Sequence, residues 1–251
     1  MAARSSGSSK GAGQSGGQVR YVDSCTLVVT HDAWSFAEAH AAEIDAFWQL
    51  RTAENATLFN GCIFMLSSYR IDAGRFSGRL LPVEFKAFLF WKERGCPDRS
   101  VFDVFGSALI RADDGAILLG RQKSGINAGL IYLPGGFIDQ RDVDEAGEVD
   151  ISASVLREIE EETGLGRWQL GVRDGFLVTT IGAQISIAVE LVADGDAETV
   201  RQRIREVLAA EAEPELDEIV AVREWAEVEA LPVPAYAQVL LAYLLHARLP
   251  V

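Results

Sequence analysis

The spacing of apolar residues in the first hundred positions predicts a small mixed α and β unit. Alternating apolar residues predict a strand at 21–30 and a hairpin formed by 62–71 and 75–81. Helical spacing predicts a helix that begins near Asp32 and an aromatic-rich helix at 83–94. These elements together predict an N-terminal α+β appendage.

A second region rich in strands begins near Val101. VFGSALIR and AILLG, joined by Asp-Asp-Gly, predict a hairpin, and Pro-Gly-Gly at 134–136 then breaks the chain sharply. In the rest of the chain, segments with the apolar spacing of strands are interspersed with segments with that of helices. The expected strands are 130–133, 175–181, 184–192 and 219–223, and the expected helices are 151–163, 197–210 and 234–247. This order predicts an α/β fold.

Composition marks the N-terminal boundary of the appendage, and the strand-rich region near Val101 marks its other end. Residues 1–18 are nearly all Ser, Gly, Ala and Gln, which cannot bury enough apolar surface to order themselves. We therefore expect a disordered tail at 1–18, the appendage at 19–100 and the main domain at 101–251.

Overall composition and charge exclude several classes of function. The 251 residues are 49% hydrophobic, and they contain no apolar run of the roughly 18 residues that a membrane span needs, so we expect a cytoplasmic protein without membrane contact. The net charge of −14 argues against a nucleic-acid partner. Cysteines and histidines lack the spacing of a zinc site.

Candidate chemistry is concentrated on the expected helix at 151–163. Glu158, Glu161 and Glu162 stand at positions i, i+3 and i+4, so they share one helical face. Rigid carboxylate oxygens suit Mg²⁺ or Mn²⁺. A solvated acidic helix surface is the alternative explanation for the glutamates alone.

The residues around these glutamates favour the metal site. The string REIEEETGL at 157–165 matches every fixed position of R-E-U-x-E-E-x-G-U, the second half of the Nudix box, and PGGFID at 134–139 resembles the loop that opens that box. The chain thus resembles the Nudix hydrolase superfamily. The resemblance implies an α/β/α sandwich with a mixed β-sheet. The appendage resembles the branch that cleaves UDP-sugars in the order of Phe47-Trp48, Leu58-Phe59-Asn60-Gly61, a hairpin and an aromatic helix before this domain.

One part of the box departs from the family pattern. The family places five residues between its glycine and its first glutamate and seven between that glutamate and the arginine. Here Glu148 is the candidate for the first glutamate, with eleven residues (137–147) after Gly136 and eight residues (149–156) before Arg157. The extra residues are expected to bulge outward as a loop.

The resemblance also implies roles for individual residues. Glu158, Glu161 and Glu162 would bind Mg²⁺ or Mn²⁺, Glu148 would pair with Arg157, and Arg157 would hold a glutamate in place. Gly135 and Gly136 would lie at the substrate. Arg121 and Lys123 are candidates for a phosphate clamp, with solvated loop cations as the alternative. Two sets stay open: the general base (Glu158, Glu162, Glu215 or Glu218) and an aromatic platform for a nucleobase (Tyr132, Phe137 or Phe176).

The sequence therefore predicts hydrolysis of a phosphoanhydride bond in a small nucleotide substrate. UDP-sugars such as UDP-glucose rank first, ADP-ribose and related nucleotide sugars second, and oxidised nucleoside triphosphates third. A non-catalytic nucleotide-sensing module and a scaffold with an accidental match to the box are the alternatives. The sequence leaves a homodimer open.

Overall fold

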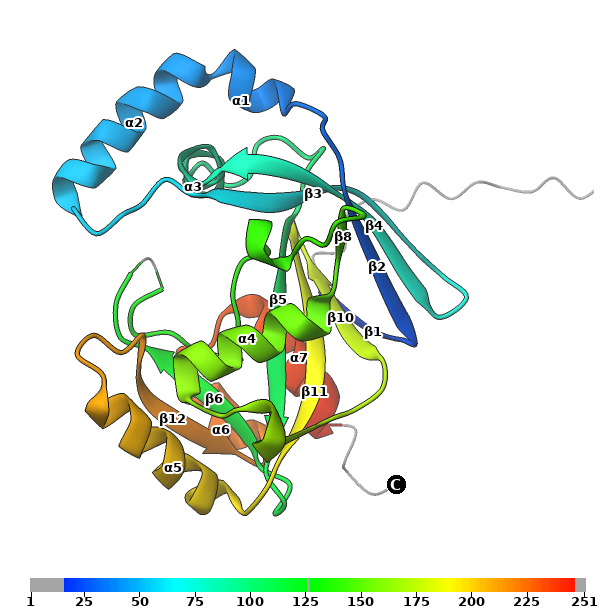
Figure 1. The fold of residues 1–251 in the computed structure, drawn as a ribbon, viewed down its shortest axis with the longest axis vertical. Coiled ribbons are helices and arrows are strands. Elements are labelled where there is room, and N and C mark those ends of the chain that lie inside the picture. The colour runs from blue at the N-terminus through cyan, green and yellow to red at the C-terminus, as the bar shows by residue number, and fades with distance from the viewer. Residues whose placement is uncertain (1–15, 126, 247–251) are drawn as a thin grey trace, which may run out of the picture.

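Two mixed β-sheets of unequal size organise the computed structural model, which describes residues 16–125 and 127–246 (Figure 1). The larger sheet has the strand order β1-β10-β11-β5-β6-β12, with β7 beside β6 and β9 beside β11. Its strands are β1 (Gln18–Val22), β5 (Asp103–Arg111), β6 (Ile117–Gln122), β7 (Ile131–Tyr132), β9 (Leu170–Val172), β10 (Phe176–Ile181), β11 (Gln184–Ala193) and β12 (Leu216–Val222). Within it, β5 and β11 are parallel, whereas the other paired strands are antiparallel.

Helices cover both faces of the larger sheet. On one face, α4 (Ile151–Thr163) and α5 (Ala197–Ala210) bury an apolar stripe against β5, β6 and β11. On the other face, α6 (Trp225–Glu229) and α7 (Ala235–His246) pack in a second core. The expected α/β/α sandwich with a mixed sheet is confirmed, because each helix buries one apolar face against the sheet.

The smaller sheet takes three of its four strands from the N-terminal part of the chain. Its order is β3-β4-β2-β8, and its strands are β2 (Ser24–Val29), β3 (Cys62–Asp72), β4 (Arg75–Glu84) and β8 (Glu148–Val149). Three helices accompany it: α1 (Ser35–Ala39), α2 (Ala41–Glu54) and α3 (Phe85–Glu93). The ribbon shows α1 and α2 arching over β3 and α3 (Figure 1). The aromatic residues of α3 belong to the hydrophobic core, with Phe88, Phe90 and Trp91 fully buried.

The two sheets exchange strands, which the sequence did not reveal. The single strand expected at 21–30 is two strands that part at Asp23, whose backbone N–H donates to the Gly74 carbonyl at 2.6 Å. β1 pairs with β10 in the larger sheet, and β2 pairs with β4 in the smaller sheet. In the opposite direction, β8 leaves the region of the sandwich and pairs with β2.

The helix that carries the candidate chemistry begins and ends where its sequence predicts. The Asp150 side chain accepts from the N–H groups of Ser152 and Ala153, each at 3.0 Å, and Gly164 closes the helix with φ 70°. Strong end signals therefore fix the register of α4. The short elements β8, β9 and α6 were not expected, because two to five residues carry little periodicity.

Three expectations concern the ends and surroundings of the chain. The disordered tail expected at 1–18 falls largely outside the described residues, and its last residue, Gln18, opens β1. The boundary between an appendage and a main domain near 100 stays a proposal. None of the described helices is long and apolar enough to cross a membrane.

Candidate active site

One edge of α4 carries the site, beside the face that packs on the sheet. Val155 and Ile159 are buried in the sandwich core, and Gly106 of β5 lies against Val155 and Ile151. A Cβ on Gly106 would meet Val155 Cγ2 at 2.6 Å, so glycine is what lets helix and sheet approach this closely. This contact fixes the direction in which the neighbouring glutamates point.

Glu162 is the most buried of the three glutamates. It is only 5% exposed, and its Oε2 accepts from the Gly135 backbone N–H at 3.2 Å. Burial and, to a lesser extent, the charges of Glu215 and Glu158 together raise the pKa of Glu162 to about 8, although the bond from Gly135 opposes the shift. Such a carboxyl strongly favours a cation or a proton at its free oxygen.

Glu158 and Glu161 are progressively more exposed along the same edge. Their side chains are 15% and 51% exposed, respectively. Burial raises the pKa of Glu158, although the positive charge of Arg157 opposes the shift. Arg157 Nη1 lies 2.6 Å from Glu158 Oε1 and 3.2 Å from Glu161 Oε2. The structure thus places the three glutamates on one edge at three levels of solvent exposure.

Glu158 and Glu161 face arginines in this structure, and the three carboxylates do not converge on one point. Within 16–125 and 127–246, no group of three or more His, Cys, Asp or Glu side chains has the arrangement of metal ligands. Glu158 and Glu161 are paired with Arg157 and Arg141 instead. The donor set nevertheless fits a hard divalent cation chemically, because it consists of carboxylate oxygens, one of them in a buried group.

Arg157 pairs with Asp142, a carboxylate that the sequence analysis did not predict as its partner. Its Nη2 lies 2.9 Å from Oδ1 of Asp142, whose side chain is only 1% exposed. Glu148, expected to make this contact, is instead an exposed residue of β8, and its backbone N–H donates to Asp144 at 2.8 Å. The predicted pairing of Glu148 with Arg157 is therefore wrong, because β8 pairs with β2 of the smaller sheet.

A count from the glycine would have found Asp142. Five residues (137–141) separate Gly136 from Asp142, which is the family spacing with Asp in place of Glu. The extra residues therefore lie after Asp142 and form the turn and short strand that end at Val149. Asp142 also accepts from the Asp139 N–H at 2.9 Å, which closes the 3₁₀ turn η1 (Gln140–Asp142).

Gly135 and Gly136 bring the chain close to α4 and to β5. Gly135 has φ 149°, and a Cβ there would lie 2.9 Å from the backbone Cα of Ser107. A Cβ on Gly136 would meet Glu158 Cδ at 2.7 Å. Both glycines are thus required by close approach, and both contact the glutamate edge through Glu162 or Glu158.

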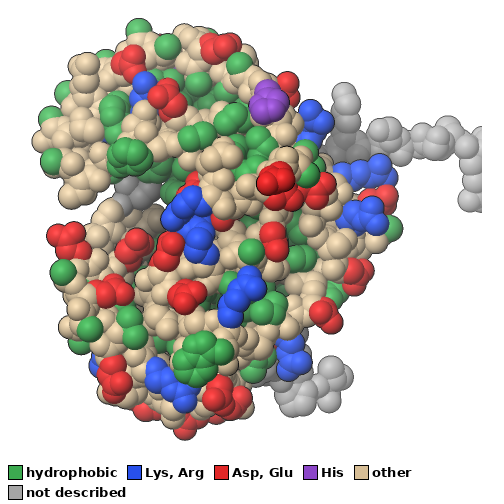
Figure 2. Space-filling view, viewed as in Figure 1, with side chains coloured by type: hydrophobic (Ala, Val, Ile, Leu, Met, Phe, Trp, Pro, Cys, Tyr) green, Lys and Arg blue, Asp and Glu red, His purple; other side chains and the backbone are tan. Residues whose placement is uncertain are grey.

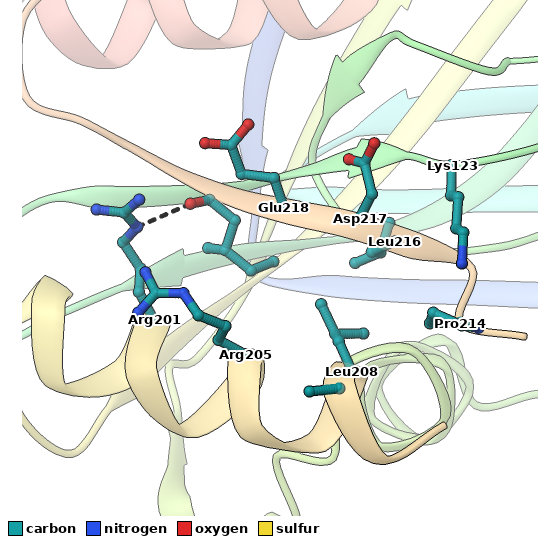
Figure 3. Close-up of a pocket in the computed structure, with 10 residues that line it drawn as sticks. Lys123, Arg201, Arg205, Leu208, Pro214, Leu216, Asp217 and Glu218 are labelled. Atoms are coloured by element: carbon teal, nitrogen blue, oxygen red, sulfur yellow. Dashed lines mark hydrogen bonds between the residues drawn. The ribbon is translucent and has the colours of Figure 1, made fainter. Parts of the chain in front are cut away.

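The two candidate phosphate-clamp residues lie in different surroundings. Arg121 Nε pairs with Glu218 at 3.1 Å, and its contact with Asp217 is 3.8 Å. Lys123 lines a pocket of about 350 Å³ between α5 and β12, together with Arg201 and Arg205 (Figure 3). The described contacts therefore do not bring either side chain to the glutamates of α4, and their predicted role stays a prediction.

The candidates for the general base and for the aromatic platform also lie in different surroundings. Glu215 is exposed and close enough for its charge to raise the pKa of Glu162, whereas Glu218 is paired with Arg121. Phe137 follows the two glycines and packs edge-on against Phe88 at a centroid distance of 5.2 Å. Tyr132 is buried, and Phe176 packs against the sandwich core. The choice of general base and the aromatic platform stay predictions.

The surface over η1 and α4 shows the same mixture of charges. Basic side chains are bordered by acidic ones there, beside a hollow between the helices α1–α3 and the sandwich (Figure 2). Arg141 of η1, which no motif in the sequence singles out, is part of this surface and is 58% exposed.

A family model and several solved structures match this chain. The NUDIX domain family model matches residues 103–246. No curated protein matches the chain. Solved structures do: the NUDIX domain of Shewanella oneidensis NrtR in complex with ADP ribose has 20% identity over 59% of this chain and 89% of that chain, with a TM-score of 0.35.

Two further solved structures are similar. The MutT protein from Methanosarcina mazei Go1 has 24% identity over 55% of this chain and 88% of that chain, with a TM-score of 0.36. A bifunctional NMN adenylyltransferase/ADP ribose pyrophosphatase from Francisella tularensis, in complex with AMP and a manganese ion, has 19% identity over 63% and 46%, with a TM-score of 0.38. Because the family model spans more than half of the sequence, the chain belongs to the NUDIX family and is a Nudix-type hydrolase.

Proposed function

We propose that this hydrolase is a divalent-metal-dependent pyrophosphohydrolase that cleaves the diphosphate of a nucleoside diphosphate joined to a second group. Nucleotide sugars are the favoured substrate class. Glu158, Glu161 and Glu162 hold Mg²⁺ or Mn²⁺ in this proposal, and Arg157 and Asp142 position them. Water from solvent is the second reactant, because the reaction is a hydrolysis.

The observation that carries the proposal is the edge of α4 with its buried carboxyl. Glu162 is almost fully enclosed, yet the described residues offer it one hydrogen bond, from the Gly135 N–H. A buried carboxylate is costly unless it is paired, protonated or bound to a cation. A divalent cation at these oxygens supplies the positive charge that a diphosphate needs in order to be attacked.

The protein's own groups provide the remaining requirements. Arg157 is held between Asp142 and the two more exposed glutamates, so it limits their side-chain rotation. A carboxylate near the cation accepts a proton from the attacking water in this proposal, and the candidates for this general base remain Glu158, Glu162, Glu215 and Glu218. A side chain at Gly136 would collide with the Glu158 carboxylate, so the glycine allows that carboxylate its position at the edge.

The order of substrates rests on the N-terminal part of the sequence. Its resemblance to the branch that cleaves UDP-sugars places UDP-sugars such as UDP-glucose first, ADP-ribose second and oxidised nucleoside triphosphates third. The proposed localisation is the cytoplasm. The proposed partner is a small nucleotide, and a homodimer stays open.

Product analysis tests the proposal directly. The purified chain is incubated with Mg²⁺ and a panel of UDP-sugars, ADP-ribose, dinucleotides and triphosphates, and the products are resolved by chromatography. UMP with a sugar 1-phosphate, AMP with ribose 5-phosphate, or a monophosphate with pyrophosphate each assigns the substrate and the bond cleaved. A panel in which nothing is hydrolysed with either Mg²⁺ or Mn²⁺ would refute the proposal.

A matched pair of variants ties any activity to the glutamate edge. Glu162→Gln removes the buried charge and should lower kcat by about a hundredfold or more. Glu160→Gln makes the same chemical change at an exposed neighbouring position and should leave kcat within about twofold. Equal kcat in both variants would contradict the assignment.

A non-catalytic nucleotide sensor is the alternative, and the same panel separates the two. A sensor would bind one of these nucleotides, as measured by calorimetry, without turning it over. Retention of all three glutamates favours the enzyme, because a sensor has no need of a complete ligand set. An accidental match in a scaffold protein would show neither binding nor turnover.

A further inference from the structure

Arg141 holds an unusual position between an anchor and the glutamate edge. Its Nε and Nη2 donate to Asp139 Oδ2 at 3.0 and 2.8 Å, which ties the guanidinium to η1. From this anchor it lies 3.7 Å from Glu158 Oε1 and 3.5 Å from Glu161 Oε1. Arg141 therefore faces the two glutamates that solvent reaches most easily.

The contacts of Arg141 with the glutamates are much weaker than those of Arg157. The Arg157 side chain is 25% exposed and is paired with the buried Asp142, whereas Arg141 is 58% exposed. Exposed ion pairs at such distances contribute little stability and exchange readily. Arg157 is thus a fixed part of the edge, while Arg141 can leave the glutamates and remain anchored at Asp139.

When Glu158 and Glu161 bind a divalent cation, their negative charge is no longer available to Arg141. A guanidinium that stays anchored within reach is then free to bind another acceptor. Phosphate oxygens match its planar fork in geometry and charge. The two other candidate cations are less well placed, since Arg121 is paired with Glu218 and Lys123 lines the pocket beside α5.

We propose that Arg141 is a substrate-binding residue that neutralises Glu158 and Glu161 in the metal-free protein and binds a phosphate oxygen of the diphosphate once a divalent cation occupies them. The inference rests on the proposed function. It assigns the phosphate contact to η1, whereas the sequence alone indicated Arg121 and Lys123. The juxtaposition that carries it is one arginine shared between Asp139 and the edge of α4.

Two binding measurements on the full chain test the inference without turnover. The first titrates Mn²⁺ alone, followed by electron paramagnetic resonance. The second titrates methylenediphosphonate, which is not hydrolysed, in the presence of saturating Mn²⁺. Arg141→Ala should bind Mn²⁺ about threefold more tightly, because a neighbouring positive charge is gone, and should bind the diphosphonate about tenfold more weakly, because a charge-assisted hydrogen bond is lost.

Two further variants separate charge from geometry. Arg141→Lys keeps the charge but loses the planar fork, so Mn²⁺ affinity should stay at the parent value while diphosphonate affinity falls by about threefold or more. Arg70→Ala, on the exposed end of β3, removes the same charge at a side chain that is 77% exposed and pairs only with Asp72 among the described residues. It should bind both probes as the parent does.

The outcomes distinguish this inference from the proposed function. A parent protein that binds no Mn²⁺ would overturn both. A parent that binds Mn²⁺, with diphosphonate affinity unchanged in Arg141→Ala, would overturn the inference and leave the proposed function standing. Tighter Mn²⁺ binding without weaker diphosphonate binding would likewise overturn the inference alone, because Arg141 would then only neutralise the glutamates.

Discussion

Replacement of Asp142 by Asn tests the contact that distinguishes this site from its sequence prediction. Asp142→Asn keeps the shape of the side chain and removes its charge. The side chain is 1% exposed, and its two oxygens accept from Arg157 Nη2 at 2.9 Å and from the Asp139 N–H at 2.9 Å. An amide has one acceptor oxygen, so one of these two donors loses its partner.

The expected cost follows from those two bonds. A hydrogen bond to a charged group contributes roughly 1.5 to 3 kcal/mol, and complete loss of one partner of a buried ion pair costs roughly 3 to 5 kcal/mol. Arg157 keeps Glu158 and Glu161 as partners and is itself a quarter exposed, which places the cost near the lower figures. We expect the free energy of unfolding to fall by roughly 2 kcal/mol.

Urea unfolding at pH 7 measures this change, with Glu148→Gln as the matched control. Glu148 is exposed on β8, so its variant should lie within about 0.5 kcal/mol of the parent. In assays with Mg²⁺, Asp142→Asn should also lower kcat, since Arg157 would no longer hold the glutamates. A larger stability loss in Glu148→Gln than in Asp142→Asn would refute the assignment of Asp142 as the partner of Arg157.

Three further predictions concern the glutamate edge and the loop that faces it. Gly136→Ala should weaken Mn²⁺ binding measured by electron paramagnetic resonance, because the new Cβ would lie 2.7 Å from Glu158 Cδ; unchanged affinity would show that Glu158 can move aside. In EDTA, the free energy of unfolding of the parent should fall as the pH rises from 5 to 8. The reason is that a Glu162 pKa raised from 4.5 to about 8 penalises the charged form in the folded state by roughly 4 to 5 kcal/mol. Glu162→Gln should reduce this dependence of stability on pH, as measured by urea unfolding at each pH. A variant that depends on pH as strongly as the parent would contradict the role of Glu162. Phe137→Ala should lower the free energy of unfolding by roughly 2 to 3 kcal/mol through lost contacts with Phe85 and Phe88, with Phe137→Leu recovering most of the loss.

Elements with strong local signals could be predicted from the sequence. The α4 helix is marked by the Asp150 cap and by Gly164 in a left-handed conformation, and its expected range of 151–163 is the observed one. The α5 helix is equally well marked, with Asp196 as its cap. In both helices, the end signals are side chains or glycines that act within a few residues, so no tertiary information is needed.

Elements that depend on distant partners could not be predicted. The expected strand at 21–30 shows continuous alternation, but Asp23 turns the chain so that β1 and β2 join different sheets. Nothing in ten residues reveals that β10 and β4 will be their partners. The two-residue strand β8 has the same origin, because it exists only through its pairing with β2.

The candidate site shows the same limit at the level of side chains. Helical geometry places Glu158, Glu161 and Glu162 on one edge, and the structure has them there. Their neighbours Asp142 and Arg141 come from η1, where the direction of each side chain depends on tertiary packing. The family pattern has a glutamate as the partner of the arginine, which points to Glu148, although the spacing from Gly136 indicates Asp142.

The loop at 135–142 links the smaller sheet to the glutamate edge of α4. The Phe64 N–H donates to the Ile138 carbonyl at 2.9 Å, so β3 holds the loop directly after Gly136. Phe137 packs on α3 from the same loop, and η1 follows with its arginine and aspartate. Because the loop is bonded to the N-terminal sheet on one side and to α4 on the other, a displacement of β3 or α3 would move Gly136 and Asp142 relative to the glutamates. The N-terminal part of the chain therefore contributes to the geometry of the hydrolase site even though the residues that would bind the cation all belong to α4.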